Sequence, residues 1–391
     1  MSNEIESKLA STEKKATLPN VMEQTPVTPT AVTTPEPAST CTCTATPSAN
    51  SAVFNQGSFP TFENCQLVAT IGQPSYDFGT ESNLDVFTAY METWHSNLPE
   101  EMQEEFKNSP DDHVSMIAFL LYRDASGDLK NLFMYSQLIW LIDINSTPIY
   151  SINPSLAAFS DSIYSILVSF LANSVGFDVS IYNDLMSRLK PKQKKLKDDQ
   201  NELLKYMTKK INDNVTSPDD VMRMVLPGYI SGSTRLINYT ALQSVIPVAY
   251  GLADWTIDSL IEKTYSTGSI SDEEKESLIS MLNRLYYCTV NRGQSPDDRA
   301  LNYSIYNTVV LSSIVKDAIK NKLEFSGYTV KPSKISRQHS IIRDVQLTFF
   351  DPSNTTIAAT TYLMQVDVSG ITPVMIGSIQ QWKSLTSVDE L

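Results

Sequence analysis

The chain has 391 residues, 41% of them hydrophobic, which is enough for one large hydrophobic core or two smaller ones. Its formal net charge of -14 and pI of about 4.7 exclude a wholly basic nucleic-acid binder and a general adhesive for anionic membranes. The four cysteines form no disulfide pattern, the N-terminus lacks a signal peptide's apolar core, and no apolar run could span a membrane. We therefore expect a reducing compartment and no membrane partner.

The first 52 residues differ from the rest of the chain in composition. They are dominated by Thr, Pro, Ser, Ala and Glu, and no aromatic residue precedes Phe54. Such a segment buries too little apolar surface to offset the entropy cost of ordering it. The sequence therefore predicts a disordered Thr/Pro/Ser-rich arm over 1–52, followed by a body over 53–391. The arm is not polybasic, because its glutamates outnumber its lysines.

The first half of the body is dominated by helical patterns. Apolar residues at i, i+3 and i+4 spacing predict a helix over 84–106 and another over 156–175. An apolar element follows the first of these at 114–122. The apolar stretch at 132–144 is compatible with a buried helix or a strand, and its pattern does not distinguish the two.

The second half continues with helical patterns and ends differently. Helices are predicted over 181–189, 193–211, 219–225, 241–264, 272–287 and 297–323. Near the end, Val345, Leu347 and Phe349 alternate with polar residues, a DPSN turn follows, and a β-branched run comes next. This pattern predicts a β-hairpin within 341–370. The predicted fold class is mainly α (α+β), a large helical body with a C-terminal β-hairpin and a disordered N-terminal arm.

The word SPDD occurs three times, at 109–112, 217–220 and 295–298, each time just before an apolar run. Serine is a favoured helix N-cap, proline suits the first helical position, and acids complement the positive end of the helix dipole. Ser109, Ser217 and Ser295 are therefore predicted to cap helices. No second set of metal ligands lies beside any copy, and the uneven spacing excludes a structural repeat.

Familiar catalytic patterns are missing. The stretch 228–236 (GYISGSTRL) has the wrong glycine spacing for a phosphate-binding loop and no lysine before Ser/Thr. The three histidines, His95, His113 and His339, lie in no zinc-binding pattern, and no GxSxG motif occurs. The sequence thus predicts no enzyme activity, no catalytic residue, no cofactor and no metal.

One charge feature is marked. The segment 188–197 holds six of the chain's 30 basic residues, and a weaker basic cluster follows at 331–337. Two interpretations remain open: non-specific contacts with RNA phosphates, or a solvated helix start whose lysines pair with Asp198 and Asp199. The candidate phosphate-contact residues are Arg188, Lys190, Lys192, Lys194, Lys195, Lys197, Lys331, Lys334 and Arg337.

The layout resembles the coat proteins of partitiviruses, the cryptic double-stranded RNA viruses. The shared features are chain size, a Pro/Thr/Ser-rich N-terminal arm, and a long, aromatic-rich, mainly helical body without catalytic motifs. The resemblance implies a capsid protein that assembles through homodimers into a shell around viral RNA, located in the virion and the host cytoplasm. The chain's 18 Tyr and 14 Phe also favour self-association, because aromatic residues are enriched at protein interfaces. Two alternatives remain, a helical nucleocapsid protein of a filamentous or negative-strand RNA virus, and a cellular scaffold or adaptor protein with a disordered tail.

Overall fold

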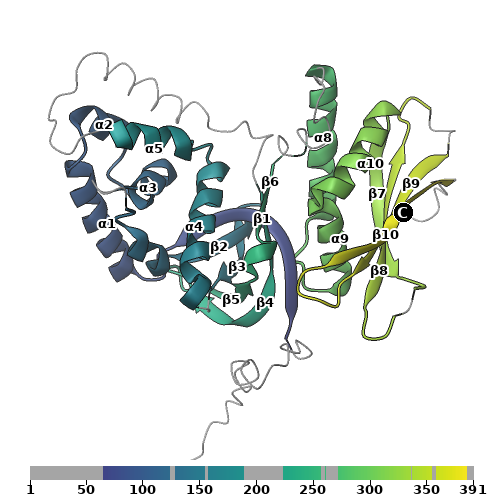
Figure 1. Cartoon of the computed structure of the whole chain (residues 1–391), viewed down its shortest axis with the longest axis horizontal. Helices are drawn as coiled ribbons and strands as arrows, with labels where there is room; N and C mark the ends of the chain where they lie inside the picture. The colour runs from purple at the N-terminus through teal and green to yellow at the C-terminus, as the bar shows by residue number, and fades with distance from the viewer. Residues whose placement is uncertain are drawn as a thin grey trace, which may run out of the picture. The chain divides into compact units, whose positions relative to one another are not determined.

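The computed structural model describes residues 65–123, 128–154, 157–188, 223–256, 260, 272–335, 337–354 and 358–384. All of them belong to one unit of the chain, Ala49–Leu391. They form two hydrophobic cores, one around a β-barrel and one against a four-stranded sheet (Figure 1). The predicted arm over 1–52 and the predicted helix over 193–211 lie outside the described residues.

A closed barrel of five strands forms the first part. The strands follow the order β1-β2-β3-β5-β4, and β4 pairs back with β1. Every pairing is antiparallel except β3 with β5. This Greek-key arrangement is that of an OB-fold barrel. The strands are β1 (Leu67–Asp77), β2 (Ile139–Ile144), β3 (Thr147–Ile152), β4 (Arg223–Arg235) and β5 (Ala241–Pro247), and β6 (Ala253–Trp255) extends the sheet beside β4.

Strand β1 changes partner at Gly72. Residues up to Gly72 pair with β4, and residues from Gln73 onward pair with β2. A Cβ atom at Gly72 would lie 2.7 Å from Cγ1 of Ile142 and closer still to the carbonyl oxygen of Asp143. Glycine therefore permits the close strand approach that closes the barrel.

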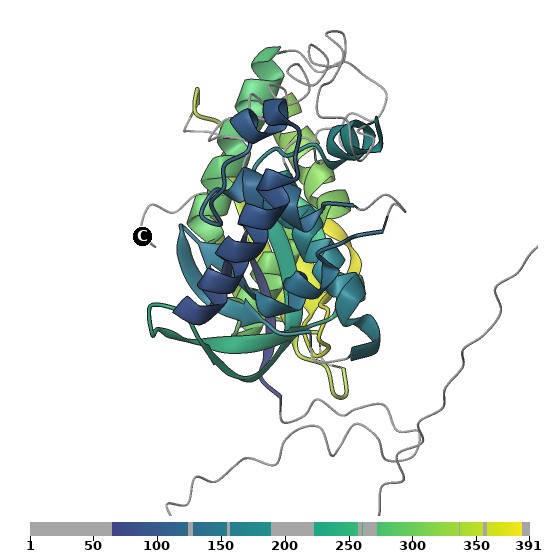
Figure 2. The ribbon, with the colours of Figure 1, turned by 90° about the vertical axis from the view of Figure 1, so that its left-hand side faces the viewer.

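Helices fill the long connections of the barrel. Between β1 and β2 lie α1 (Glu81–Ser96), α2 (Glu100–Glu105), α3 (His113–Leu120) and the 3-10 helix η2 (Leu132–Gln137). After β3 come α4 (Ala157–Ser174) and α5 (Val179–Arg188). Figure 2 shows the helices of these connections in front of the barrel strands. We call 65–256 the barrel lobe. Its core contains Phe87, Trp94 and Phe119, and the rings of Trp94 and Phe119 meet edge to face with centroids 5.8 Å apart.

The second part, 272–384, is called the C-terminal lobe. Its antiparallel sheet has the order β10-β9-β8-β7, and helices pack on one of its faces. Leu311 and Ile314 from a helix meet Val345, Leu347 and Phe349 from the sheet in one core. The elements are α8 (Asp272–Thr289), α9 (Pro296–Tyr306), α10 (Thr308–Lys320), β7 (Glu324–Pro332), β8 (Ile342–Phe350), β9 (Ala359–Asp367) and β10 (Val374–Ser384).

The predicted mainly α fold class is wrong, because the protein is α+β with a closed barrel and a second sheet. The described part of the predicted helix over 219–225 is the start of β4, and that of the one over 241–264 is mostly β5 and β6, with the short 3-10 helix η3 (Ala249–Gly251) between them and one helical residue at Leu260. Met224, Val225 and Leu226 are all buried, and a consecutive apolar run carries no period that separates a strand from a buried helix. The predicted hairpin is confirmed as β8 and β9, but it is the centre of a larger sheet.

Several helices are confirmed with adjusted ends. The predicted helices over 156–175, 181–189 and 272–287 are α4, α5 and α8. The predicted helix over 84–106 is interrupted before Pro99, which precedes α2, and the one over 297–323 is broken at Asn307, which caps α10 by accepting from the Val310 N–H. The ambiguous stretch 132–144 is a 3-10 helix followed by a strand.

The SPDD predictions have three different outcomes. Ser295 caps α9 with a full capping box, because its hydroxyl accepts from the Asp298 N–H at 3.0 Å and the Asp298 carboxylate accepts from the Ser295 N–H. The prediction for Ser109 is wrong, because the cap of α3 is Asp112, whose carboxylate accepts from both Ser115 and Lys107. Ser217 lies outside the described residues.

This difference predicts unequal effects of serine removal. Ser295→Ala should lower the free energy of unfolding by about 0.5–2 kcal/mol, because the Asp298 N–H loses its acceptor. Ser109→Ala should change it by less than about 0.5 kcal/mol, because that hydroxyl serves only an exposed turn, where it accepts from the Asp111 N–H at 3.3 Å. Denaturant unfolding measures both values. An equal loss in the two variants would contradict the assigned caps.

Candidate functional site

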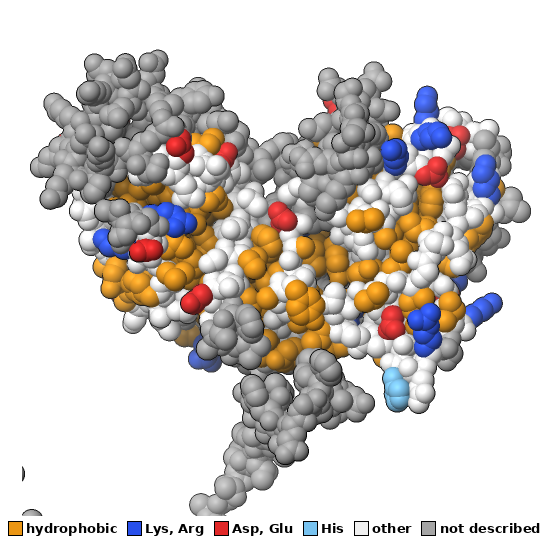
Figure 3. Space-filling model, viewed as in Figure 1, with side chains coloured by type: hydrophobic (Ala, Val, Ile, Leu, Met, Phe, Trp, Pro, Cys, Tyr) orange, Lys and Arg blue, Asp and Glu red, His pale blue; other side chains and the backbone are white. Residues whose placement is uncertain are grey.

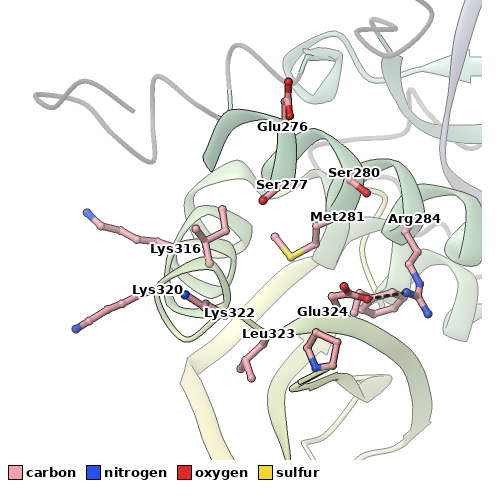
Figure 4. Close-up of a pocket in the computed structure, with 13 residues that line it drawn as sticks. Glu276, Ser277, Ser280, Met281, Arg284, Lys316, Lys320, Lys322, Leu323 and Glu324 are labelled. Atoms are coloured by element: carbon pink, nitrogen blue, oxygen red, sulfur yellow. Dashed lines mark hydrogen bonds and ion pairs between the residues drawn. The ribbon is translucent and has the colours of Figure 1, made fainter. Parts of the chain in front are cut away.

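A groove of about 990 Å³ lies in the C-terminal lobe between α8, α10 and the start of β7 (Figure 4). Ligand-binding clefts typically measure about 300–1,000 Å³, so this one is large. Its apolar lining, which we call the floor, consists of Met281, Ile319, Leu323, Phe325 and Pro352. Figure 4 shows the Met281 side chain pointing into the space between the two helices. The floor thus offers apolar surface to a ligand lying along the helices.

Helical spacing sets the walls. Glu276, Ser280 and Arg284 follow one another four residues apart on α8, so they share one face. Lys316 and Lys320 have the same spacing on α10, and Figure 4 shows both extending outward from that helix. The α8 wall therefore carries mixed polar groups, whereas the α10 wall carries positive charge.

The turn from α10 into β7 completes the rim. The Leu323 N–H donates to the Ala318 carbonyl at 2.9 Å, and the Lys322 N–H donates to the Ile319 carbonyl at 3.0 Å. These two bonds form a Schellman motif, in which the residue after the helix cap is left-handed. That residue is Lys322, with φ of 53°. The backbone thus places an exposed lysine at the end of the groove.

The charges of the groove oppose those of the whole chain. Four cationic side chains and two glutamates line it, whereas the chain carries a net charge of -14. Arg284 and Glu324 form an ion pair with Nη1 and Oε2 3.3 Å apart, and both side chains are about half exposed. An exposed pair of this kind contributes only about 0–1 kcal/mol. Figure 3 shows Lys and Arg side chains gathered over α10 and the neighbouring strands.

A smaller pocket of about 460 Å³ lies among the loops at one end of the sheet. Its lining includes Arg337, Asp367 and Ser369. Burial opposes ionisation of Asp367, but hydrogen bonds from Ser369 and Ser340, with the nearby Arg337 charge, outweigh burial and lower its pKa. The carboxylate is thus held by the protein's own groups and does not face an incoming ligand unpaired.

Within the described part of the chain, no group of three or more His, Cys, Asp or Glu could hold a metal ion. Among the same residues, no helix is both long enough and apolar enough to span a bilayer.

The predicted phosphate-contact residues are only partly described. Lys190, Lys192, Lys194, Lys195 and Lys197 lie outside the described residues, and Arg188 is the last residue of α5. Lys331 is at the end of β7, and Lys334 and Arg337 follow in the loop to β8, all exposed. Their contact with phosphate stays a prediction.

Sequence reasoning did not identify the groove. Both wall helices were predicted, and the charged residues at 276, 284, 316 and 320, with Ser280, have the spacing of helix faces. The signal that the two faces meet is tertiary, because the walls are about 40 residues apart in the chain and α9 lies between them.

Two comparisons with known proteins bear on this site. Residues 269–382 match the family described as PatG C-terminal. This segment is less than a third of the chain, and it contains every residue that lines the groove. The fold is similar to a solved structure described as the PatG Domain of Unknown Function, with a TM-score of 0.59 and 24% sequence identity. That match covers 82% of this chain and 99% of the other, and at this identity it shows the fold. No curated protein matches the chain.

These findings correct the functional expectations. Both matches point to PatG and neither to a virus, so the resemblance to partitivirus coat proteins is wrong. The predicted capsid function is wrong with it, as is the predicted location in the virion and the host cytoplasm, and neither the nucleocapsid nor the scaffold alternative is supported. Self-association and the absence of enzyme activity stay predictions.

Proposed function

We propose that the chain is a non-catalytic binding domain of a bacterial biosynthetic protein, and that its groove holds a peptide segment of a partner. The PatG match supports the biosynthetic setting, which is that of the patellamide cyanobactins. In this setting the domain would hold a peptide while other domains act on it. The non-catalytic role agrees with the absence of catalytic motifs in the sequence.

The apolar floor between two helices is the observation that carries the proposal. Ile319 and Leu323 line the open groove and are half-buried, and Met281 and Phe325, which also line it, are buried. Two helices walling an apolar groove form the surface on which an amphipathic helix docks through i, i+3 and i+4 anchors. The groove also lies wholly inside the segment that matches the family.

Peptide binding by the full chain tests the proposal. The probes are fluorescent amphipathic peptides of about 18 residues, which form roughly five helical turns. Ile319→Gln should weaken the binding of the best probe about tenfold or more, because burying one isoleucine contributes about 1.5–3 kcal/mol. Val309→Gln is the matched control, since Val309 is on the same helix, is 74% exposed and does not line the groove.

Two results would contradict the proposal. One is equal binding by the Ile319→Gln and Val309→Gln proteins, because the groove floor would then be uninvolved. The other is a change in the mass of the probe after long incubation with the protein, which would indicate that the domain is an enzyme. Mass spectrometry of the recovered probe provides this second readout.

A further inference from the structure

The positive rim of the groove restricts what can occupy it. Lys320 and Lys322 are exposed on the α10 side, and Arg284 stands at the β7 end. The opposite wall presents Ser277, Ser280 and a glutamate. An occupant with carboxylates along one side would therefore face the cations of α10, while its apolar side covers the floor.

Lys322 adds an independent observation. Glycine is the usual residue at the left-handed position of a Schellman motif, because a side chain there costs backbone energy. This chain has a lysine at that position, with φ of 53°, and its side chain lines the groove. Residues held in sparsely populated backbone conformations cluster at functional sites. A lysine at this position is expected if its charge contributes to binding.

The Arg284–Glu324 pair marks where a partner's acid can bind. Both side chains are about half exposed, so the pair is weak and open to competition. A carboxylate of the occupant would therefore compete with Glu324 for Arg284. Glu324 would then turn to solvent.

Resting on the proposed function, we propose that the occupant is an acidic amphipathic helix. Its apolar face lies on Ile319 and Leu323, and its carboxylates pair with Lys320, Lys322 and Arg284. A nucleic acid would also meet the cations but would leave the apolar floor uncovered, so an acidic peptide fits the groove better.

Three matched peptides test the charge requirement. They share apolar positions and carry Glu, Gln or Lys at the remaining positions. The Glu peptide should bind the full chain about tenfold more tightly than the Gln peptide in anisotropy titrations, and salt should reduce this difference. The Lys peptide should bind most weakly. Lys320→Gln should remove most of the preference for Glu, whereas Lys331→Gln, an exposed lysine outside the groove, should leave it unchanged.

Lys322→Gly separates binding from stability. The glycine relieves the left-handed conformation, so the melting temperature should rise, while affinity for the Glu peptide should fall severalfold. Affinity for the Gln peptide should stay unchanged. If Lys322→Gly is stabilised but binds the Glu peptide as tightly as the parent protein does, Lys322 is not part of the binding site.

The outcomes distinguish this inference from the proposed function. Equal binding of the Glu and Gln peptides, with Ile319→Gln still weakening both, would overturn the acidic occupant and retain the peptide groove. If no peptide binds, both proposals fail. A single-stranded RNA oligomer that outcompetes the Glu peptide in a Lys320-dependent manner would overturn the peptide in favour of a nucleic acid. A dimer that Ile319→Gln dissociates in sedimentation would identify a second copy as the occupant.

Discussion

Gly293→Ala is expected to lower the free energy of unfolding by about 3 kcal/mol or more. Gly293 has φ of 66°, in the left-handed region. A Cβ atom there would lie 2.5 Å from the carbonyl carbon of Ala69 and closer still to its oxygen. Both neighbours are backbone atoms of β1, so no side chain can move aside. Relief would have to separate the two segments and break the hydrogen bond from the Ala69 N–H to the Gly293 carbonyl, which is 3.0 Å long.

This contact joins the two lobes. Residues of β1 before Gln73 have no β2 partner, and the loop before α9 takes its place at their edge. The Thr70 hydroxyl donates to the Asn291 carbonyl, and the Tyr150 hydroxyl donates to the Arg292 carbonyl at 3.0 Å. Hydrogen exchange measured on Gly293→Ala should therefore show faster opening in both lobes, because these hydrogen bonds couple the two lobes.

Gly327→Ala is the control for Gly293→Ala. An ideal Cβ at Gly327 has no atom within 4 Å outside its chain neighbours, and its φ is not in the left-handed region. Alanine there should change the free energy of unfolding by less than about 1 kcal/mol, and it reduces the freedom of the unfolded chain. Urea unfolding measures both variants. Similar losses of unfolding free energy in the two variants would show that the close approach of Gly293 to Ala69 does not make position 293 more sensitive to a side chain.

The helices that could be predicted are those whose packing is local and one-sided. In α4 and α8 one stripe of side chains faces the core and the opposite stripe faces water, so the sequence shows a helical period. Ser295 was predictable for a related reason, because the capping box is completed within four residues. Ser109 shows the limit of that logic, because Lys107 and Ser115 favour the Asp112 carboxylate as the cap.

The barrel could not be predicted because its closure is tertiary. The first half of β4 is buried on successive residues, from Met224 to Leu226, so the period-2 signal of a strand is lost. In β1, Gly72 and Pro74 count against a strand by propensity, yet both pair within the barrel. The groove was missed for the same reason. Its walls are predictable helices, but their meeting depends on how α8 and α10 pack on one sheet.

Asn302→Asp should lower the free energy of unfolding by an amount that grows as the pH rises. Asn302 is 3% exposed, and its Nδ2 donates to the Ala69 carbonyl and to Oδ1 of Asn291, both at 2.8 Å. Asn291 cannot turn to compensate, because its Oδ1 also accepts from the Gly293 N–H and its Nδ2 donates to the Thr289 carbonyl. A carboxylate at 302 would keep one oxygen as the acceptor of the Asn291 Nδ2 hydrogen bond but would direct its other oxygen at two acceptors in a buried site. Burial and the repulsion from these acceptors raise its pKa above the ordinary value of about 3.9.

The sign of the pH dependence follows from that raised pKa. Below about pH 3.9 the new carboxyl is protonated in the folded and unfolded states, and its O–H can donate to one of the two acceptors. As pH rises through the raised folded value, the folded state must bury a charge, so stability relative to the parent protein falls progressively. At pH 7 the deficit should reach about 3 kcal/mol or more, because a buried charge faces unpaired acceptors. Urea unfolding of both proteins from pH 4 to 8 measures the difference. Asn302→Leu, which also removes the donor but cannot ionise, should show a deficit that does not change with pH. If the difference between Asn302→Asp and the parent protein did not change with pH, water would reach this position, and the Asn302 amide would not be a buried contact between the lobes.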